Sequence, residues 1–173
     1  MPDPMTATFL ALFGDWTSII ADVFRRAIEG AILAALPHRR KSDIAVTKIG
    51  LSAVYRDYIA CLNEQDWSRL ERFVDDGAIH NGRRIGLSGY REMLERDFDE
   101  IPDLYFNVTM LIADPPLIAS RIDFDCRPKA RFLGLPVDGR RVSFSENVIY
   151  EFRGEKIVQV WSVVDKAAIE AQI

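Results

Sequence analysis

The sequence predicts an α+β fold in which N-terminal helices cover the concave face of a curved antiparallel sheet, forming a cone-shaped barrel. Two patterns support this prediction. Apolar residues between positions 49 and 98 recur at helical spacing, whereas those between 104 and 164 alternate with a period of two. Helices that precede a run of long strands are typical of α+β proteins. The sequence contains no strand–helix–strand alternation and no glycine-rich phosphate-binding motif, which disfavours Rossmann and P-loop folds.

Each element of the body follows from its apolar pattern and its end signals. Ile49 to Leu62 form one helical stripe, Asp66 can cap a short second helix, and Ser88 can cap a third. Alternation and turn residues then predict the remaining elements. These are a short strand at 78–81, long strands at 104–112, 118–126, 140–152 and 156–164, and a last helix at 166–172.

The first part of the chain has a different pattern, so we predict two regions: residues 1–46 as a helical N-terminal extension and linker, and residues 47–173 as the cone domain. Apolar residues between Phe9 and Leu36 recur at helical spacing, and residues 37–43 are typical of a linker. The extension can dock as an amphipathic helix on the body or on a partner chain. It can instead lie weakly on a membrane surface, or be read-through with little structure. The sequence leaves these three interpretations open.

Composition and charge exclude several classes of function. The 173 residues carry a net charge of −4, so we expect no nucleic-acid partner. Two cysteines and two histidines cannot supply zinc-ligand spacing or a disulfide scaffold. Charged residues interrupt the apolar N-terminal segment, so we expect neither an integral membrane span nor a signal peptide. The chain is therefore predicted to be a soluble, cytoplasmic, metal-free protein.

Candidate chemistry comes from polar residues that share a strand face with apolar ones. Glu146 falls on the apolar face of strand 140–152, and Asp165 shares a face of the last strand with Trp161. Burial beside an aromatic side chain raises a carboxyl pKa and favours proton transfer near neutral pH. Because a cone of this kind can hold a small molecule, these residues are candidates for acid–base chemistry on a small-molecule substrate.

Each candidate also has a purely structural interpretation. Asp165 directly precedes a helix and can serve as its N-cap, and Glu146 can pair with an arginine of the next strand. His80 can be a hydrogen-bonded structural histidine. Tyr58 lies on the inward stripe of the first helix and can be a core residue. The residues alone leave these alternatives open.

Several motifs in the second region occur together in one known family. They are His80-Asn81-Gly82 before Gly89-Tyr90, Ile101-Pro102-Asp103-Leu104, Phe132-Leu133-Gly134-Leu135-Pro136, Ile149-Tyr150-Glu151-Phe152, and Trp161 four residues before Asp165. On these motifs, residues 47–173 resemble the SnoaL-like polyketide cyclase (ester cyclase) family of the nuclear-transport-factor-2-like superfamily. The closing Trp-x-x-x-Asp stretch is the most specific of them.

The resemblance implies a cone with no metal and no organic cofactor, often paired as a homodimer through its sheet. Family members close a ring of an aromatic polyketide methyl ester by intramolecular aldol condensation, with a carboxylate like Asp165 as general acid/base. It further implies that His80 lines the cavity and that Trp161 walls it, and we expect His80 to assist catalysis as a donor or orienting group. We expect Glu146 and Tyr58 as further substrate contacts. The predicted function is a cofactor-independent, cyclase-like enzyme acting on a small apolar carbonyl compound.

One position departs from the family pattern, because Pro128 stands where family members frequently carry a histidine. A non-catalytic small-molecule-binding module on the same fold is therefore an alternative. A third hypothesis, an isomerase or epoxide hydrolase, requires an Asp–Arg–Asp cluster to which Arg121 and Asp123 could contribute. Together with Asp125 and Arg127, however, these residues are most simply a solvated face of cross-strand pairs.

Overall fold

The computed structural model describes residues 41–173, with side chains from residue 50 onward. Residues 1–40, and with them most of the predicted extension, lie outside the described residues, so its three interpretations are not addressed. Residues Ala45–Ile173 form one compact unit. Helix α2 (Lys41–Asn63) begins within the segment predicted as linker, so residues 41–46 are helical. The helix can extend this far because Pro37 is the last proline before it.

The remaining elements follow the predicted order. They are the 3₁₀ turn η1 (Leu70–Arg72), β1 (Val74–His80), β2 (Arg83–Arg84), α3 (Gly86–Glu100), β3 (Asn107–Asp114), β4 (Leu117–Cys126), β5 (Arg131–Phe132), β6 (Leu135–Pro136), β7 (Val142–Arg153), β8 (Lys156–Val164) and α4 (Lys166–Glu170). The predicted second helix is only the turn η1, since the chain already enters β1 at Val74.

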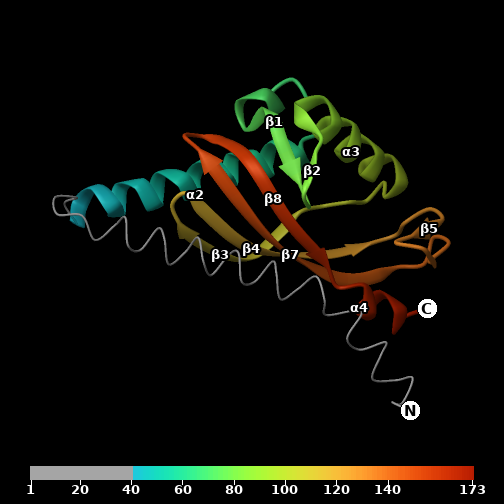
Figure 1. Ribbon diagram of the computed structural model, residues 1–173. Helices are drawn as coiled ribbons and strands as arrows, with labels where there is room; N and C mark the ends of the chain where they lie inside the picture. Colours follow the sequence, from blue (N-terminus) through green and yellow to red (C-terminus); the bar gives the residue numbers. More distant parts are fainter. Residues whose placement is uncertain (1–40) are drawn as a thin grey trace, which may run out of the picture. The chain divides into compact units, whose positions relative to one another are not determined.

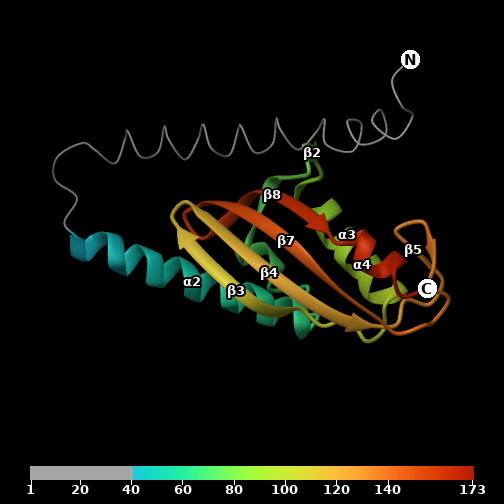
Figure 2. The ribbon, with the colours of Figure 1, turned by 90° about the horizontal axis from the view of Figure 1, so that it is seen from below.

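Six strands form one curved sheet in the order β2-β1-β8-β7-β4-β3 (Figures 1 and 2). All neighbours are antiparallel except β1 and β8, which run parallel. The short strands β5 and β6 form a separate hairpin. The predicted α+β cone is therefore confirmed, with one parallel pair in a mostly antiparallel sheet.

Helices α2 and α3 cover the concave face of this sheet (Figure 1). Tyr55 of α2 places its hydroxyl 2.6 Å from the Ser120 hydroxyl of β4, and its ring lies 5.2 Å from that of Tyr150 on β7. Helix α3 buries Tyr90, Leu94 and Phe98, one apolar stripe at helical spacing. Tyr90 and Leu94 belong to the same core, and Phe98 packs beside it against Trp67 and Phe106. Figure 2 looks onto the opposite, outward face of the strands.

Two β-bulges decide which side chains face the concave side. The predicted alternation is confirmed in β4 and β7, where every second residue from Ile118 and from Val142 lies inward. In β3 the pairing register shifts between Val108 and Met110. In β8 Phe152 pairs with Ile157 and Glu151 with Gln159, so Val158 is the extra residue. Because one extra residue reverses the faces beyond it, the predictions for the far ends of β3 and β8 were wrong.

Candidate active site

A cavity of about 580 Å³ lies between the sheet and helices α2 and α3. Its walls come from α2, β1, α3, β4, β7, β8, the β5–β6 hairpin and the first residue of α4. This volume is within the range of roughly 300–1,000 Å³ that is common for small-molecule sites. The residues that line it divide into an aromatic wall and a polar wall.

The aromatic wall is a chain of phenylalanine rings. Phe106 packs edge-on against Phe124 with ring centroids 5.5 Å apart, and Phe124 stacks on Phe144 at 5.1 Å. Phe132, from the β5–β6 hairpin, lies 5.5 Å from Phe144. All four rings line the cavity. Such a wall favours a flat apolar or aromatic ligand, because ring stacking adds to the burial of apolar area.

The polar wall begins with a pair of tyrosines. Tyr58 of α2 and Tyr90 of α3 both line the cavity, and their hydroxyl oxygens lie 2.7 Å apart. Burial raises the pKa of both hydroxyls well above the usual value for tyrosine. Both groups therefore keep their protons at neutral pH, and they can donate hydrogen bonds.

Glu146 is the carboxyl group of the polar wall, and it projects from β7 into the cavity as predicted. The Ser162 hydroxyl of β8 donates a hydrogen bond to its Oε1. Asn81, at the end of β1, holds Ser162 in place: the Ser162 amide donates to Asn81 Oδ1 at 2.8 Å, and Asn81 Nδ2 donates to the Ser162 carbonyl at 3.1 Å. Burial raises the pKa of Glu146, and the Ser162 hydrogen bond opposes this shift. The alternative that Glu146 pairs with an arginine of the next strand is not observed in the described residues.

His80, the last residue of β1, also lines the cavity. Its ring contacts that of Tyr90 edge-on, with centroids 6.3 Å apart. Burial lowers the pKa of its imidazole, so the neutral ring prevails at neutral pH. A neutral imidazole can donate one hydrogen bond and accept another. The structure thus brings together three of the predicted site residues: Glu146, His80 and Tyr58.

A further carboxyl group that was not predicted from the sequence, that of Asp97 on α3, also lines this cavity. Burial raises its pKa from 3.8 to about 6, and the charges of Glu100 and Glu146 add to the shift, whereas Arg96 opposes it. An aspartate in a helix is usually solvated, so residue type gave no signal. The usable signal was position, since Asp97 lies four residues after Met93 and three after Leu94, which both line the cavity.

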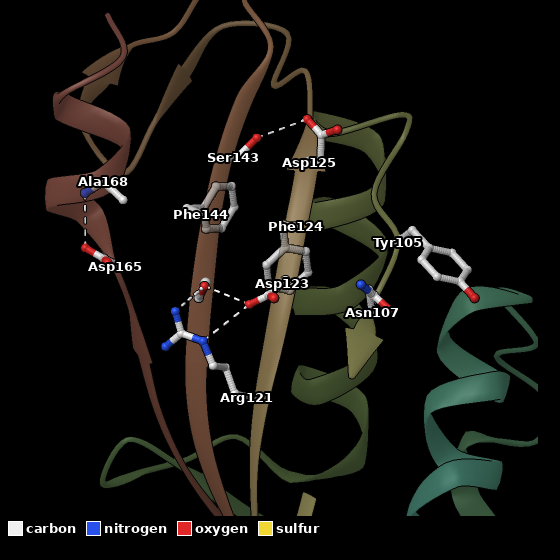
Figure 3. Close-up of a pocket in the computed structure, with 11 residues that line it drawn as sticks. Tyr105, Asn107, Arg121, Asp123, Phe124, Asp125, Ser143, Phe144, Asp165 and Ala168 are labelled. Atoms are coloured by element: carbon white, nitrogen blue, oxygen red, sulfur yellow. Dashed lines mark hydrogen bonds and ion pairs between the residues drawn. The ribbon is translucent and has the colours of Figure 1, made fainter. Parts of the chain in front are cut away.

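Asp165 and Trp161, the other two predicted site residues, do not line this cavity. The bulge at Val158 places Val160, Ser162 and Val164 inward and leaves Trp161 on the other face of the strand. Asp165 is exposed, and its carboxylate accepts a hydrogen bond from the Ala168 amide at 3.0 Å, which makes it the N-cap of α4 (Figure 3). The expectation that both share a cavity face with Ile157 was therefore wrong, and a catalytic role of Asp165 stays a prediction.

The outward face of the sheet carries the charged cluster that the sequence predicts as solvated (Figure 3). Arg121 donates to the Ser145 hydroxyl at 2.7 Å and lies 3.4 Å from Asp123. Asp125 accepts hydrogen bonds from Nε and Nη2 of Arg141, at 2.7 and 2.8 Å, and no ion pair of Asp125 with Arg127 is observed in the described residues. A second hollow of about 720 Å³ on this face is lined by Arg121, Asp123, Asp125 and Asp165. None of these four lines the inner cavity.

Pro128, at the position of the frequent family histidine, is buried at the base of the β5–β6 hairpin, where its carbonyl accepts from the Gly139 amide at 2.8 Å. It does not line the cavity. Among residues 50–173, whose side chains the structure describes, no three His, Cys, Asp or Glu side chains gather as metal ligands would. No helix of residues 41–173 combines the length and the apolar composition needed to cross a membrane.

The sequence model of the SnoaL-like polyketide cyclases matches residues 52–173, which include every wall of the cavity. The chain belongs to this family. The fold is accordingly that of the nuclear-transport-factor-2-like superfamily, and the family supports a cyclase-like function.

Solved structures agree with this assignment. A SnoaL-like polyketide cyclase from Agrobacterium tumefaciens is 52% identical, with a TM-score of 0.70 over 70% of this chain and 96% of that one. TsrD from Streptomyces laurentii, 22% identical, matches 72% of this chain and 95% of its own with a TM-score of 0.64. IdmH from Streptomyces antibioticus, 19% identical, matches 70% of this chain and 96% of its own with a TM-score of 0.61. The last two show the shared fold alone. No curated protein matches the chain.

Proposed function

We propose that this SnoaL-like protein is a cofactor-independent cyclase that closes a ring in a small, largely apolar carbonyl compound by acid–base chemistry. One observation supports this above the others: Glu146 places a carboxyl group with a raised pKa in an aromatic cavity, where the Ser162 hydroxyl holds it. A carboxylate in such surroundings is a stronger base than one in water.

We assign the proton transfer to Glu146 and not to Asp165. The Glu146 carboxylate takes a proton from the carbon next to a substrate carbonyl, and the resulting enolate attacks a second carbonyl of the same molecule. The aromatic wall holds the chain folded, so the two reacting carbons meet without a further loss of freedom. Asp165 cannot serve this cavity from its capping position on the outward side.

The tyrosine pair and His80 supply the hydrogen bonds that this reaction needs. Tyr58 or Tyr90 donates to the oxygen on which negative charge develops, because each keeps its proton. His80, neutral beside Tyr90, orients that hydroxyl or the substrate. In this proposal Tyr58 acts directly on the substrate and is more than a core residue.

The decisive experiment compares the wild type with Glu146→Gln, Asp165→Asn and Glu155→Gln. Linear and partly cyclised polyketide methyl esters are the probes, and chromatography with mass spectrometry follows ring closure against the spontaneous rate. Glu146→Gln should lose about 10²- to 10⁴-fold in rate, the usual range for general acid–base catalysis. Glu155→Gln, in the exposed turn between β7 and β8, is the matched control and should behave as wild type.

The Asp165 variant separates the two assignments. Unchanged turnover in Asp165→Asn together with a loss in Glu146→Gln supports our proposal, and the reverse result restores Asp165. Circular dichroism checks that each variant is folded. Saturable binding of these esters without any turnover by the wild type would favour the alternative, a non-catalytic binding module.

We also propose that two copies of the chain pair through the outward face of β3 and β4, consistent with the habit of the family. Met110 and Ile112 are 55% and 59% exposed there, and β3 is an edge strand of the sheet. Large exposed apolar side chains on a strand face are typical of an interface. Sedimentation should give a dimer for the wild type and a monomer for Ile112→Glu. A monomeric wild type would contradict the proposal.

A further inference from the structure

Asp97 occupies a position on α3 where an amphipathic helix normally carries an apolar residue. Tyr90, Met93 and Leu94 precede it on the cavity side of the helix, and Ile101 follows it there. Asp99, two residues further on, is exposed and pairs with Lys129 at 3.1 Å. The same residue type thus has two environments within one helical turn, and only Asp97 lines the cavity.

Asp97 and Glu146 enter one cavity from opposite sides, one from helix α3 and the other from strand β7. Their immediate partners differ. Glu146 accepts a hydrogen bond from the Ser162 hydroxyl, whereas the Asp97 carboxylate accepts none from any residue in the described part of the chain. A donated hydrogen bond favours the ionised form of a carboxyl group, so the Ser162 hydrogen bond favours ionisation of Glu146, whereas Asp97 receives no such bond.

We propose that Asp97 and Glu146 form a carboxyl pair, in which Asp97 is the general acid and Glu146 the general base of the ring closure. This inference rests on the proposed function, and it adds a catalytic residue to it.

The proposed step balances in atoms and charge. Glu146 removes the proton next to the first carbonyl, the new carbon–carbon bond forms, and the electron pair of the attacked carbonyl moves to its oxygen. Asp97 gives its proton to that oxygen, which becomes the hydroxyl of the product. Glu146 ends protonated and Asp97 ionised, and proton exchange between them or with water restores the pair. No oxidant, reductant or second substrate is needed.

The electrostatics of the cavity agree with these roles. Burial raises the pKa of Asp97 to about 6, and the charge of Glu146 makes a smaller contribution in the same direction, so a fraction of Asp97 keeps its proton close to neutral pH. Arg96, on the same helix, opposes the shift, and Glu100 adds to it. The other titratable or charged groups around the cavity are His80 of β1, Tyr58 of α2, Tyr90 of α3, Tyr150 of β7 and Lys166 of α4.

Two measurements test the pair independently. Carbon-13 NMR of protein labelled at the aspartate carboxyl groups follows the titration of Asp97, which is identified by its loss in Asp97→Asn. In Glu146→Gln its midpoint should fall, because the neighbouring charge is gone, whereas in the matched control Asp99→Asn it should not move. An unchanged midpoint in Glu146→Gln would overturn the pair.

The second measurement is the pH dependence of ring closure with the same methyl esters. The wild-type rate should decrease as pH rises through the Asp97 midpoint, because the acid form is lost. Asp97→Asn should lower the rate at least 10-fold and abolish this decrease, and Asp99→Asn should retain it. A wild-type profile in Asp97→Asn would overturn the role of Asp97 as acid. If the wild type turns over no ester, the proposed function fails, and the NMR titration still decides whether the two carboxyl groups are paired.

Discussion

Acidic side chains lie on both sides of the sheet, in different surroundings. On the concave side, Glu146 of β7 and Asp97 of the covering helix α3 line the same cavity as the aromatic wall, and burial raises the pKa of both. On the outward face, Asp125 is exposed and accepts two hydrogen bonds from Arg141, which lower the pKa of its carboxyl group. The comparison shows that surroundings, and not residue type, decide which carboxylate can move a proton near neutral pH.

After that of Glu146→Gln, the largest expected effect concerns the tyrosine pair that α2 and α3 contribute to the concave side. Tyr58→Phe removes one of two hydroxyls that lie 2.7 Å apart in the cavity wall. We expect a loss in kcat of about 100-fold, typical of removing one donor to a developing oxyanion, and little change in KM. Tyr55→Phe is the matched control, because its hydroxyl bonds Ser120 and does not line the cavity. Equal kinetics of the two variants would contradict the role of Tyr58.

The next effect is on the free energy of unfolding, and it concerns the buried carboxyl group of Asp97. Asp97 has a pKa of about 6 in the folded protein against an ordinary value of 3.8. Its ionisation therefore costs the folded state more than the unfolded chain, and the free energy of unfolding decreases as pH rises from 4 to 6. Asp97→Asn should be more stable than the wild type by roughly 1–3 kcal/mol at pH 7 and equally stable at pH 4. Urea unfolding at both pH values measures this, and a destabilised variant at pH 7 would refute it.

A smaller effect is expected for the outward Asp165. Its side chain caps α4 through the Ala168 amide, so Asp165→Ala should lower the free energy of unfolding by about 1 kcal/mol. Asp165→Ser should restore most of this loss, because serine is also a good N-cap. Thermal unfolding of the three proteins compares them. If serine fails to restore stability, the capping hydrogen bond is not what Asp165 contributes.

The smallest effect is expected for Asp125. Its paired carboxylate favours the folded state at neutral pH, and this contribution is lost as pH falls through its lowered pKa. Because the pair with Arg141 is exposed, Asp125→Asn should change stability less than either variant above, and the change should vanish in high salt. An effect of Asp125→Asn that persists in high salt would contradict the expectation that the exposed pair with Arg141 contributes little to stability.

Regular alternation allowed much of the fold to be predicted from sequence. It correctly placed Glu146 and the inward residues of β4 and β7. It failed for Trp161, because strand periodicity carries no signal for the extra residue Val158. His80 was predicted from the motif that it begins, and Tyr58 from the helical stripe of the first helix of the body. The structure places both in the cavity wall.

The missed carboxyl group shows a different limit of sequence reasoning. Asp97 is followed by an apolar residue, Phe98, and then by two exposed acidic residues, Asp99 and Glu100. An acidic residue next to others on a helix is normally read as part of the solvated face. Only the packing of α3 over a hollow, instead of over a filled core, lets an ionisable side chain point inward there.

The bulge at Val158 also affects how this cavity can change over generations. A point mutation alters one side chain of the wall at a time. Deletion of the single codon for Val158 would remove only the bulge and leave each later residue on its present face. Deletion of the codon for Val160, with the bulge retained, would instead move every residue beyond it to the other face together. Trp161 and Val163 would then enter the cavity, and Ser162 would leave Glu146. One small insertion or deletion in this strand therefore exchanges the set of side chains that line the cavity, although none of these side chains has itself been substituted.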